Sequence, residues 1–215
     1  GLNFAASTVG GNLAATATTG NMTDSGALAI TGTTTLTTSA NDATIALDTT
    51  TNAFTGAVTI TTNDSSGTDA DVTIDGGTTA LILAASTIDG DLTVRSGNAS
   101  GITDSGTVTV GGNLSATTDA NNGVIDLGTT TVTGTMDLTS HGSGDVTIDN
   151  DTSDIVLIAS EIGGNLTLTS GATAGITDTG TVTVAGNLVA TTDLNSGVIN
   201  LGTMAVTRSE EHTSN

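Results

Sequence analysis

Short apolar segments separated by polar corners recur along the whole chain. Within each segment Val, Ile or Leu alternates with Thr or Asp, as in "TVTV" (107–110), "LTLT" (166–169) and "DVTID" (145–149). This period of two predicts strands with one buried and one exposed face. Gly, Asn, Asp and Ser between the segments favour tight corners. Because no stretch has a helical period, the pattern predicts an all-β protein.

The sequence also contains a much longer repeat, in addition to this alternation. The segments "STVGGNL" (7–13), "STIDGDL" (86–92) and "SEIGGNL" (160–166) align with one another. We therefore divide a single domain, residues 1–207, into repeats at about 7–85, 86–159 and 160–207. The first repeat carries extra residues near "TNDSSGTDA" (62–70), which we expect in a surface loop.

A repeated array of short strands predicts a parallel β-solenoid rather than a sandwich. A sandwich does not repeat itself at a fixed long period, whereas stacked coils of roughly 18–25 residues do. We predict an elongated molecule of about ten coils, roughly 50 Å long at ~4.8 Å per coil. Val108 and Val110 should then point into the core, and Thr107 and Thr109 should point outward.

Charge narrows the range of partners. The 215 residues include two Lys or Arg and 22 Asp or Glu, a formal net charge of −20, and there is no Cys. Nothing here could neutralise a phosphate backbone, which argues against nucleic acid, and anionic membrane surfaces are disfavoured for the same reason. No apolar run approaches the roughly 20 residues of a membrane-spanning helix, so we expect no membrane insertion. The chain begins at Gly1 without a signal peptide, and we expect a piece of a longer protein.

Several segments resemble a known family. "GITDSGTVTVGGNLSATTD" (101–119), "NAFTGAVTIT" (52–61) and "GGNLTLTSGATAGITDTG" (163–180) are similar to the repeat region of large secreted bacterial adhesins of the filamentous-haemagglutinin type and of autotransporter-like adhesins. The resemblance covers residues 7–207. It implies a right-handed β-helix on the bacterial cell surface, an outer-membrane secretion partner, and a host or glycan receptor whose identity stays open.

The last eight residues depart from the repeat. "RSEEHTSN" (208–215) contains one of the two basic residues and one of the two His. It resembles the translation of a sequencing-adapter sequence. We interpret it as a non-repeat tail of artefactual origin and expect it to be disordered.

A calcium site has one candidate position. Asp149, Asp151 and Ser153 imitate the opening of a calcium loop, but Asp154 stands where Gly is needed and Ser160 where Glu is needed. A solvated acidic corner is the simpler interpretation. We predict no cofactor, with calcium as the open alternative.

Catalysis is the least favoured function. Solenoid enzymes that act on acidic polysaccharides combine Asp with Arg or Lys, yet Arg95 is the only basic residue before the tail, and Trp and Tyr are absent. We expect no catalytic residues. The leading hypothesis is a structural rod segment of a secreted surface adhesin.

The alternative hypothesis is a binding module for ice or a glycan. It would use outward Thr side chains, for which the sequence offers Thr107, Thr109, Thr181 and Thr183 in two "TVT" segments. A usable plane needs such a pair on nearly every coil, and these two segments lie a whole long repeat apart.

Other recurring polar residues receive structural interpretations. Asn113, Asn165 and Asn187 recur in the "GN" corners and should form a corner ladder. Asp104 and Asp178, like Asp24, precede Ser or Thr and then Gly, a pattern typical of turns.

Overall fold

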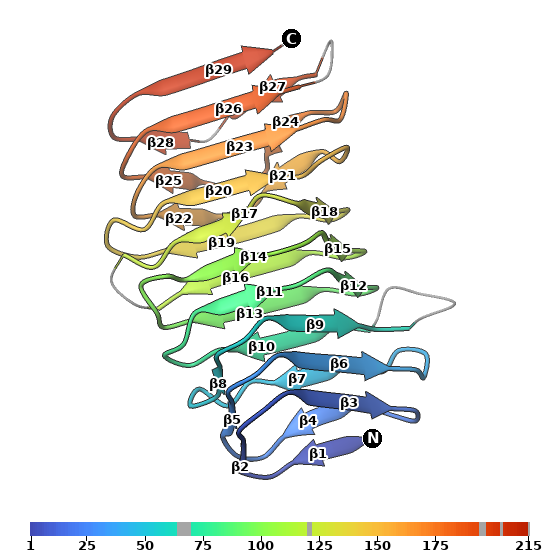
Figure 1. Ribbon diagram of the computed structural model, residues 1–215. Coiled ribbons are helices and arrows are strands. Elements are labelled where there is room, and N and C mark those ends of the chain that lie inside the picture. Colours follow the sequence, from blue (N-terminus) through green and yellow to red (C-terminus); the bar gives the residue numbers. More distant parts are fainter. Residues whose placement is uncertain (64–69, 120–121, 194–196, 203, 215) are drawn as a thin grey trace.

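The computed structural model describes residues 1–63, 70–119, 122–193, 197–202 and 204–214. Throughout these residues the chain winds as short parallel strands, without a helix, into a β-solenoid of about nine turns (Figure 1). The predicted all-β solenoid is therefore confirmed, with about one turn fewer than expected. Residues 64–69 of the extra segment lie outside the described residues.

The strands pair in three sheets, each built from strands of successive coils. The first sheet contains β1 (Leu2–Phe4), β4 (Met22–Asp24), β7 (Ile45–Leu47), β10 (Val72–Asp75), β13 (Leu92–Ser96), β16 (Leu114–Thr118), β19 (Met136–Ser140), β21 (Ile155–Leu157), β22 (Ser160–Ile162), β24 (Ile176–Asp178), β25 (Val182–Val184), β27 (Ile199–Asn200) and β28 (Met204–Val206). The second contains β3 (Leu13–Ala17), β6 (Thr34–Thr38), β9 (Val58–Thr61), β11 (Leu81–Leu83), β12 (Ser86–Ile88), β14 (Ile102–Asp104), β15 (Val108–Val110), β17 (Ile125–Leu127), β18 (Thr130–Val132), β20 (Val146–Asp149), β23 (Leu166–Ser170), β26 (Leu188–Thr192) and β29 (Glu210–Ser214). The third contains β2 (Ser7–Val9), β5 (Leu28–Ile30) and β8 (Ala53–Phe54).

Each coil carries three strands, and paired residues of neighbouring coils lie one coil apart in sequence. The separation ranges from 20 positions, between Leu2 and Met22, to 27 positions, between Ile45 and Val72. The widest step contains the extra segment of the first repeat. All pairs are parallel, so the strands of each coil stack on those of the coil before.

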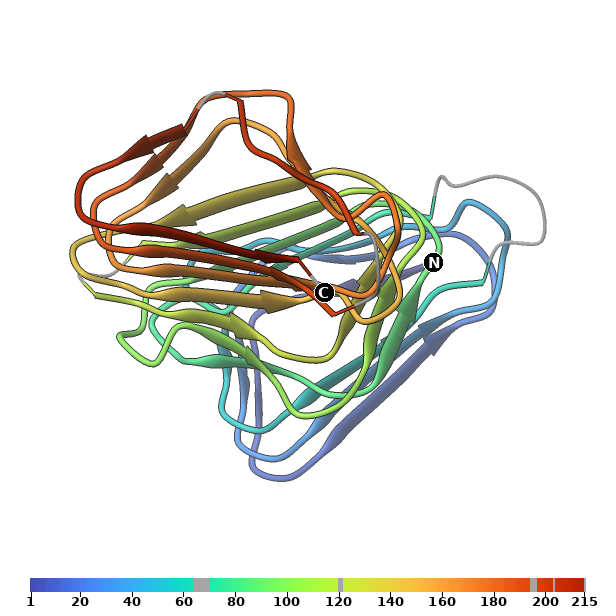
Figure 2. The same cartoon turned by 90° about the horizontal axis from the view of Figure 1, so that it is seen from above.

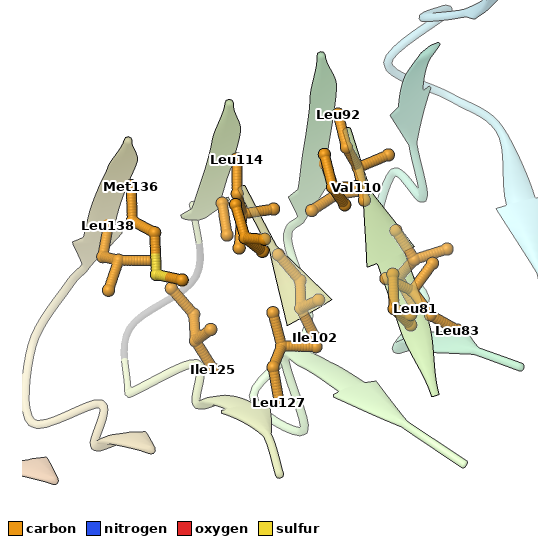
Figure 3. Close-up of a cluster of buried hydrophobic side chains, with 14 of the residues drawn as sticks. Leu81, Leu83, Leu92, Ile102, Val110, Leu114, Ile125, Leu127, Met136 and Leu138 are labelled. Atoms are coloured by element: carbon orange, nitrogen blue, oxygen red, sulfur yellow. The ribbon is translucent and has the colours of Figure 1, made fainter. Parts of the chain in front are cut away.

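The core is one continuous column of aliphatic side chains inside the coils. Alternate residues of the strands point inward, and the inward Val, Ile and Leu are buried along most of the chain. Figure 3 shows part of this column, where Leu83, Ile102 and Leu114 come from different strands and lie in one cluster. Fully burying such a side chain contributes roughly 1.5–3 kcal/mol.

The long repeat does not contain a whole number of coils. Residues 7–85 hold the ten strands β2 to β11, and residues 86–159 hold the ten strands β12 to β21. Since a coil uses three strands, one repeat makes three coils and one further side. Equivalent strands of successive repeats therefore lie one side further round the solenoid, and Figure 2 shows the outline of the coils changing along the stack.

The additional side begins where one long strand pairs with two short strands of the next coil. Val58 and Thr61 of β9 pair with Leu83 of β11 and Thr87 of β12, so that four steps along the chain lie opposite three. Met136 and Thr139 of β19 pair in the same way with Leu157 of β21 and Glu161 of β22. This is a bulge with one additional residue, which bends the chain locally.

A short side ends at each of these places, and a side chain covers its edge. Above β18 the amide of Asn150 takes the place of a further strand. Its Oδ1 accepts the N–H of Val132 at 2.7 Å, and its Nδ2 donates to the carbonyl oxygens of Val132 at 3.0 Å and Asp154 at 2.6 Å. Above β8 the hydroxyl of Thr79 accepts the N–H of Phe54 at 3.1 Å. The backbone groups at these edges are thus satisfied without a strand.

The tail, for which we predicted disorder, contains β29 instead. This strand pairs with β26 from Leu188 opposite Glu210 to Thr192 opposite Ser214. Its five side chains are all exposed, so it adds nothing to the core. The pairing has a backbone origin, because the free edge of β26 offers donors and acceptors to any extended segment.

Candidate functional site

The four Thr residues predicted as a ligand-facing ladder all point outward. Thr107, Thr181 and Thr183 are exposed and Thr109 is half-buried, while the Val residues beside them are buried. They do not form one ladder, however. Thr109 lies on β15 in the second sheet and Thr183 on β25 in the first. The reason is the ten-strand repeat, which places the second "TVT" segment on another side of the solenoid.

Thr109 belongs to a longer ladder that the long repeat conceals. Strand pairing connects one outward Thr on each of six successive coils, and we call this set the Thr column: Thr16, Thr37, Thr61, Thr87, Thr109 and Thr131. A second outward Thr lies two residues earlier on four of these coils, at Thr35, Thr59, Thr107 and Thr129. The hydroxyl of Thr129 donates to Oδ2 of Asp104, whereas the other three hydroxyls point outward without such a bond. Aligning the sequence by coil rather than by long repeat would have found this ladder.

The column that contains Thr183 is mixed. Its members are paired in the order Arg95, Thr117, Thr139, Glu161, Thr183 and Ala205. These residues occupy the same places in the second and third repeats that the Thr column occupies in the first and second. Charged and apolar side chains interrupt this ladder, so the two columns present different surfaces.

Asn113 lies in a corner ladder with neighbours that the sequence analysis did not name. Its backbone N–H donates to Oδ1 of Asp91 at 2.7 Å, and its own Oδ1 accepts the N–H of Thr135 at 2.8 Å and the hydroxyl of Thr135 at 2.9 Å. Asp91 in turn donates its backbone N–H to Oδ1 of Asp71 at 2.8 Å. Each side-chain oxygen therefore holds the corner of the next coil.

Asn165 and Asn187 stack in a different corner. Asn187 donates its N–H to Oδ1 of Asn165 at 2.9 Å, and Asn165 donates its N–H to Oδ1 of Asp145 at 2.7 Å. The hydroxyl of Ser209 donates to Oδ1 of Asn187 at 3.0 Å. The three Asn residues thus divide between two ladders, again because the repeats are turned relative to one another.

Asp104 and Asp178 connect coils rather than closing their own turns. Oδ1 of Asp104 accepts the N–H of Gly128 at 3.0 Å, and its Oδ2 accepts the N–H of Thr129 at 2.9 Å. Oδ1 of Asp178 accepts the N–H of Gly202 at 2.6 Å. The turn interpretation identified these residues as structural, but these bonds reach backbone groups one coil further along.

The residues considered for calcium do not converge on one point. Oδ1 of Asp149 accepts the N–H of Asp151 at 3.0 Å, and the N–H of Ser153 donates to the carbonyl oxygen of Asn150 at 2.8 Å. Ser160 is buried at the bulge above β19, where its hydroxyl accepts the N–H of Leu138 at 3.1 Å. Within the described ranges, no three His, Cys, Asp or Glu side chains are grouped so as to hold a metal ion.

One groove on the first sheet combines carboxylates with Thr hydroxyls and the Arg95 side chain. A hollow of about 400 Å³ is lined by Asp48, Thr50, Thr73, Asp75, Thr93, Arg95 and Asp119. Arg95 donates to Asp119 at 3.0 Å, and both side chains are largely exposed. Burial raises the pKa of Asp75, against the opposing effects of its hydrogen bond from Gly77 and of the Arg95 charge. Burial also raises the pKa of Asp137 on β19.

These features define a β-solenoid repeat protein whose polar side chains mainly tie coil to coil. A model of the family described as repeats of unknown function (DUF5649) matches residues 1–61, 69–127 and 143–207. These segments cover most of the chain, which therefore belongs to this family. The last match ends at residue 207, where the repeat pattern also ends. No curated protein and no solved structure matches the chain. Among the described residues there is no helix long and apolar enough to cross a membrane.

Proposed function

We propose that this chain is a structural rod segment of a large secreted bacterial surface adhesin and that it performs no catalysis. The observation that carries the proposal is the unbroken stack of coils. In the first sheet a single path of ten paired strands runs from β1 to β27, and one aliphatic cluster follows it from Ala15 to Ala190. A molecule built this way supplies length and stiffness along one axis.

The repeat supports the role of a spacer. Each coil rests on its neighbours and adds ~4.8 Å, so that the nine steps from β1 to β27 span roughly 43 Å. In such arrays stability is a sum over repeats and their interfaces, and further repeats extend the rod without a new fold. The exposed carboxylates favour a soluble surface and keep rods apart.

The resemblance to adhesin repeats supports a location of this rod outside the cell. It favours export through an outer-membrane secretion partner, a place on the bacterial cell surface, and a host or glycan receptor bound by some part of the complete adhesin. An antibody raised against the chain should label intact cells of the source bacterium. Confinement of the protein to the cytoplasmic fraction would contradict the proposal.

The spacer role can be measured directly. One, two or three tandem copies of residues 1–207 are placed between a surface anchor and a fluorescent domain, and the height of the fluorophore is measured. A rod predicts a height that grows linearly, by roughly 43 Å per copy for about nine coils at ~4.8 Å per coil. A matched Gly/Ser linker grows with the square root of its length. Square-root growth for the repeat copies would overturn the rod role.

A further inference from the structure

The Thr column presents hydroxyls that have no hydrogen-bond partner among the described residues. Thr16, Thr61 and Thr87 are exposed, and Thr37, Thr109 and Thr131 are half-buried. Across the described part of the chain, none of these six hydroxyls makes a hydrogen bond, in contrast to the corner hydroxyl of Thr135, which donates to Asn113. Their donors and acceptors are therefore free for a partner outside the chain.

The hydroxyls form a regular two-dimensional array. Neighbouring coils place equivalent side chains ~4.8 Å apart, and residues two apart on one strand lie ~6.6 Å apart. Thr35 with Thr37, Thr59 with Thr61, and Thr107 with Thr109 supply such pairs. The bulge above β9 divides the array into two panels of three coils, but the column stays paired through it, from Thr61 to Thr87.

Each Thr holds its groups at a fixed point. A β-branched side chain has few χ1 choices, and on a paired strand its backbone position is set by both neighbouring coils. The surface is thus a regular grid of Thr side chains. Its ~4.8 Å spacing between coils is close to the short oxygen–oxygen repeat on exposed faces of hexagonal ice.

The array is also uncharged, although the chain is strongly acidic. All six strands that carry it lack Asp, Glu, Lys and Arg, while the whole chain has 22 acidic residues. The carboxylates lie in the corners and on other sides, and Asp149 and Asp151 line a hollow at the edge of the array together with Thr107. A charged side chain would hold its own disordered hydration shell, and none interrupts this stripe.

Two other occupants fit the stripe less well. A sugar is usually bound by stacking on an aromatic ring, and the chain has no Trp or Tyr. A second copy of the chain would need roughly 800 Å² per partner for a stable interface. The stripe measures only about 24 Å by 10 Å, from five steps of ~4.8 Å and the width of two side chains.

We propose that the Thr column, with Thr35, Thr59 and Thr107, is an ice-binding surface whose ligand is crystalline water. The grid holds water in positions that continue into the ice lattice, so that a growing ice front incorporates the ordered layer and is pinned there. This inference goes beyond the rod role and does not depend on it, because a free segment in solution would bind ice equally well.

The internal repeat supplies a matched test. Thr37 on β6 and Thr117 on β16 occupy equivalent places, as do Thr109 on β15 and Thr183 on β25. The double variant Thr37→Lys with Thr109→Lys puts a charge into each panel. The control, Thr117→Lys with Thr183→Lys, puts the same charges into the column that already contains Arg95 and Glu161. Thermal hysteresis, ice-crystal shape and inhibition of recrystallisation are measured, with circular dichroism to verify the fold.

The proposal expects hysteresis and faceted crystals from the unaltered chain, loss of both in the Thr37/Thr109 variant, and retention in the Thr117/Thr183 variant. Absence of hysteresis and of recrystallisation inhibition in the unaltered chain at millimolar concentration would overturn it. Equal loss in both folded variants would also overturn it, because the effect would then not belong to the Thr column.

Discussion

Ile60 donates its backbone N–H to the hydroxyl oxygen of Ser86, at 3.0 Å, where one long strand receives two short ones. The same hydroxyl donates to the carbonyl oxygen of Ala84 at 2.7 Å, so that one side chain fills the gap in the ladder made by the bulge. Ser160 does the same for Leu138 and Ile158, both at 3.1 Å. These Ser residues begin the "STIDGDL" and "SEIGGNL" segments, which explains why Ser recurs at this position of the long repeat.

We expect Ser86→Ala to weaken the solenoid at this bulge. The change leaves the buried N–H of Ile60 and the partly buried carbonyl of Ala84 without this partner, which costs roughly 1–3 kcal/mol. Hydrogen exchange at the amide of Ile60 should accelerate, and the urea midpoint should fall. Ser115→Ala, on the outward face of β16, is the control and should change neither. Unaltered exchange at Ile60 in the Ser86 variant would show that the hydroxyl does not fill the gap.

Asn150→Asp should destabilise the chain more than Asn12→Asp. Asn150 is fully buried and uses both ends of its amide, so a carboxylate would lose two donated bonds and bury a charge, with a cost above the roughly 1–3 kcal/mol of a neutral group. Asn12 is exposed, and its Oδ1 only accepts the N–H of Thr33, which Asp can also do. Chemical denaturation of both variants tests the difference, and equal midpoints would contradict the role given to Asn150.

Gly101→Ala should be among the most damaging single changes. Gly101 has φ +64°, and an added Cβ would collide with the backbone of Val124 on the next coil. Gly175 in the second "GIT" segment has φ +73° and would collide with Val198. Strain in such a conformation costs roughly 1–3 kcal/mol before the collision is added. Gly128→Ala is the control, because its Cβ would meet nothing closer than 4.0 Å. A thermal midpoint that falls equally in both variants would argue against this steric explanation.

Asp137 should make stability depend on pH in a defined direction. Burial raises its pKa in the folded chain, so the folded state binds a proton more readily than the unfolded state. Stability therefore falls as pH rises through the raised pKa, and it recovers on acidification toward the ordinary Asp pKa of 3.8. Asp137→Asn should raise the thermal midpoint at pH 7 and reduce the gain in stability that acidification gives the unaltered chain. Asp126→Asn, on the exposed face of β17, removes an equal formal charge. An equal gain from that control would assign the effect to net charge alone.

Association should appear when the charge is removed. The chain carries a formal charge of −20 at pH 7 and has a pI of about 4.1. At neutral pH and low salt, repulsion should keep it dispersed, whereas near pH 4 or in high salt the strand edges at β1 and β29 become free to pair with other copies. Light scattering over pH and salt tests this. A monomer at pH 4 would mean that those edges are not accessible for pairing.

The fold could be predicted from the sequence because the signals for strands and corners are local. The alternation in Val108–Val110 predicts which side chains are buried, and the polar corners predict where strands end. The arrangement of the sides was not accessible in the same way. The sequence near Ser86 gives no sign that β11 and β12 both pair with β9. The one additional residue between them becomes apparent only once the pairing of Val58 and Thr61 is known.

That single residue explains the failure of the predicted ladder. Thr107 and Thr109 were grouped with Thr181 and Thr183 because their letters match, whereas spatial neighbours are set by the coil, through Thr87 and Thr131. The tail shows the reverse case, in which pairing occurs although the sequence gives no signal for it. Its side chains do not fit the repeat, yet the backbone of residues 210–214 is enough to pair with β26.

The ten-strand repeat gives the molecule a symmetry that no single coil possesses. Because each repeat ends one side further round, a patch borne once per repeat moves to the next side of the solenoid with every repeat. After three repeats, thirty strands complete ten coils, and the same side faces the same direction again. A filament of many such repeats would therefore display each patch toward three directions in turn, and a partner approaching from any quarter would meet one without the filament having to rotate.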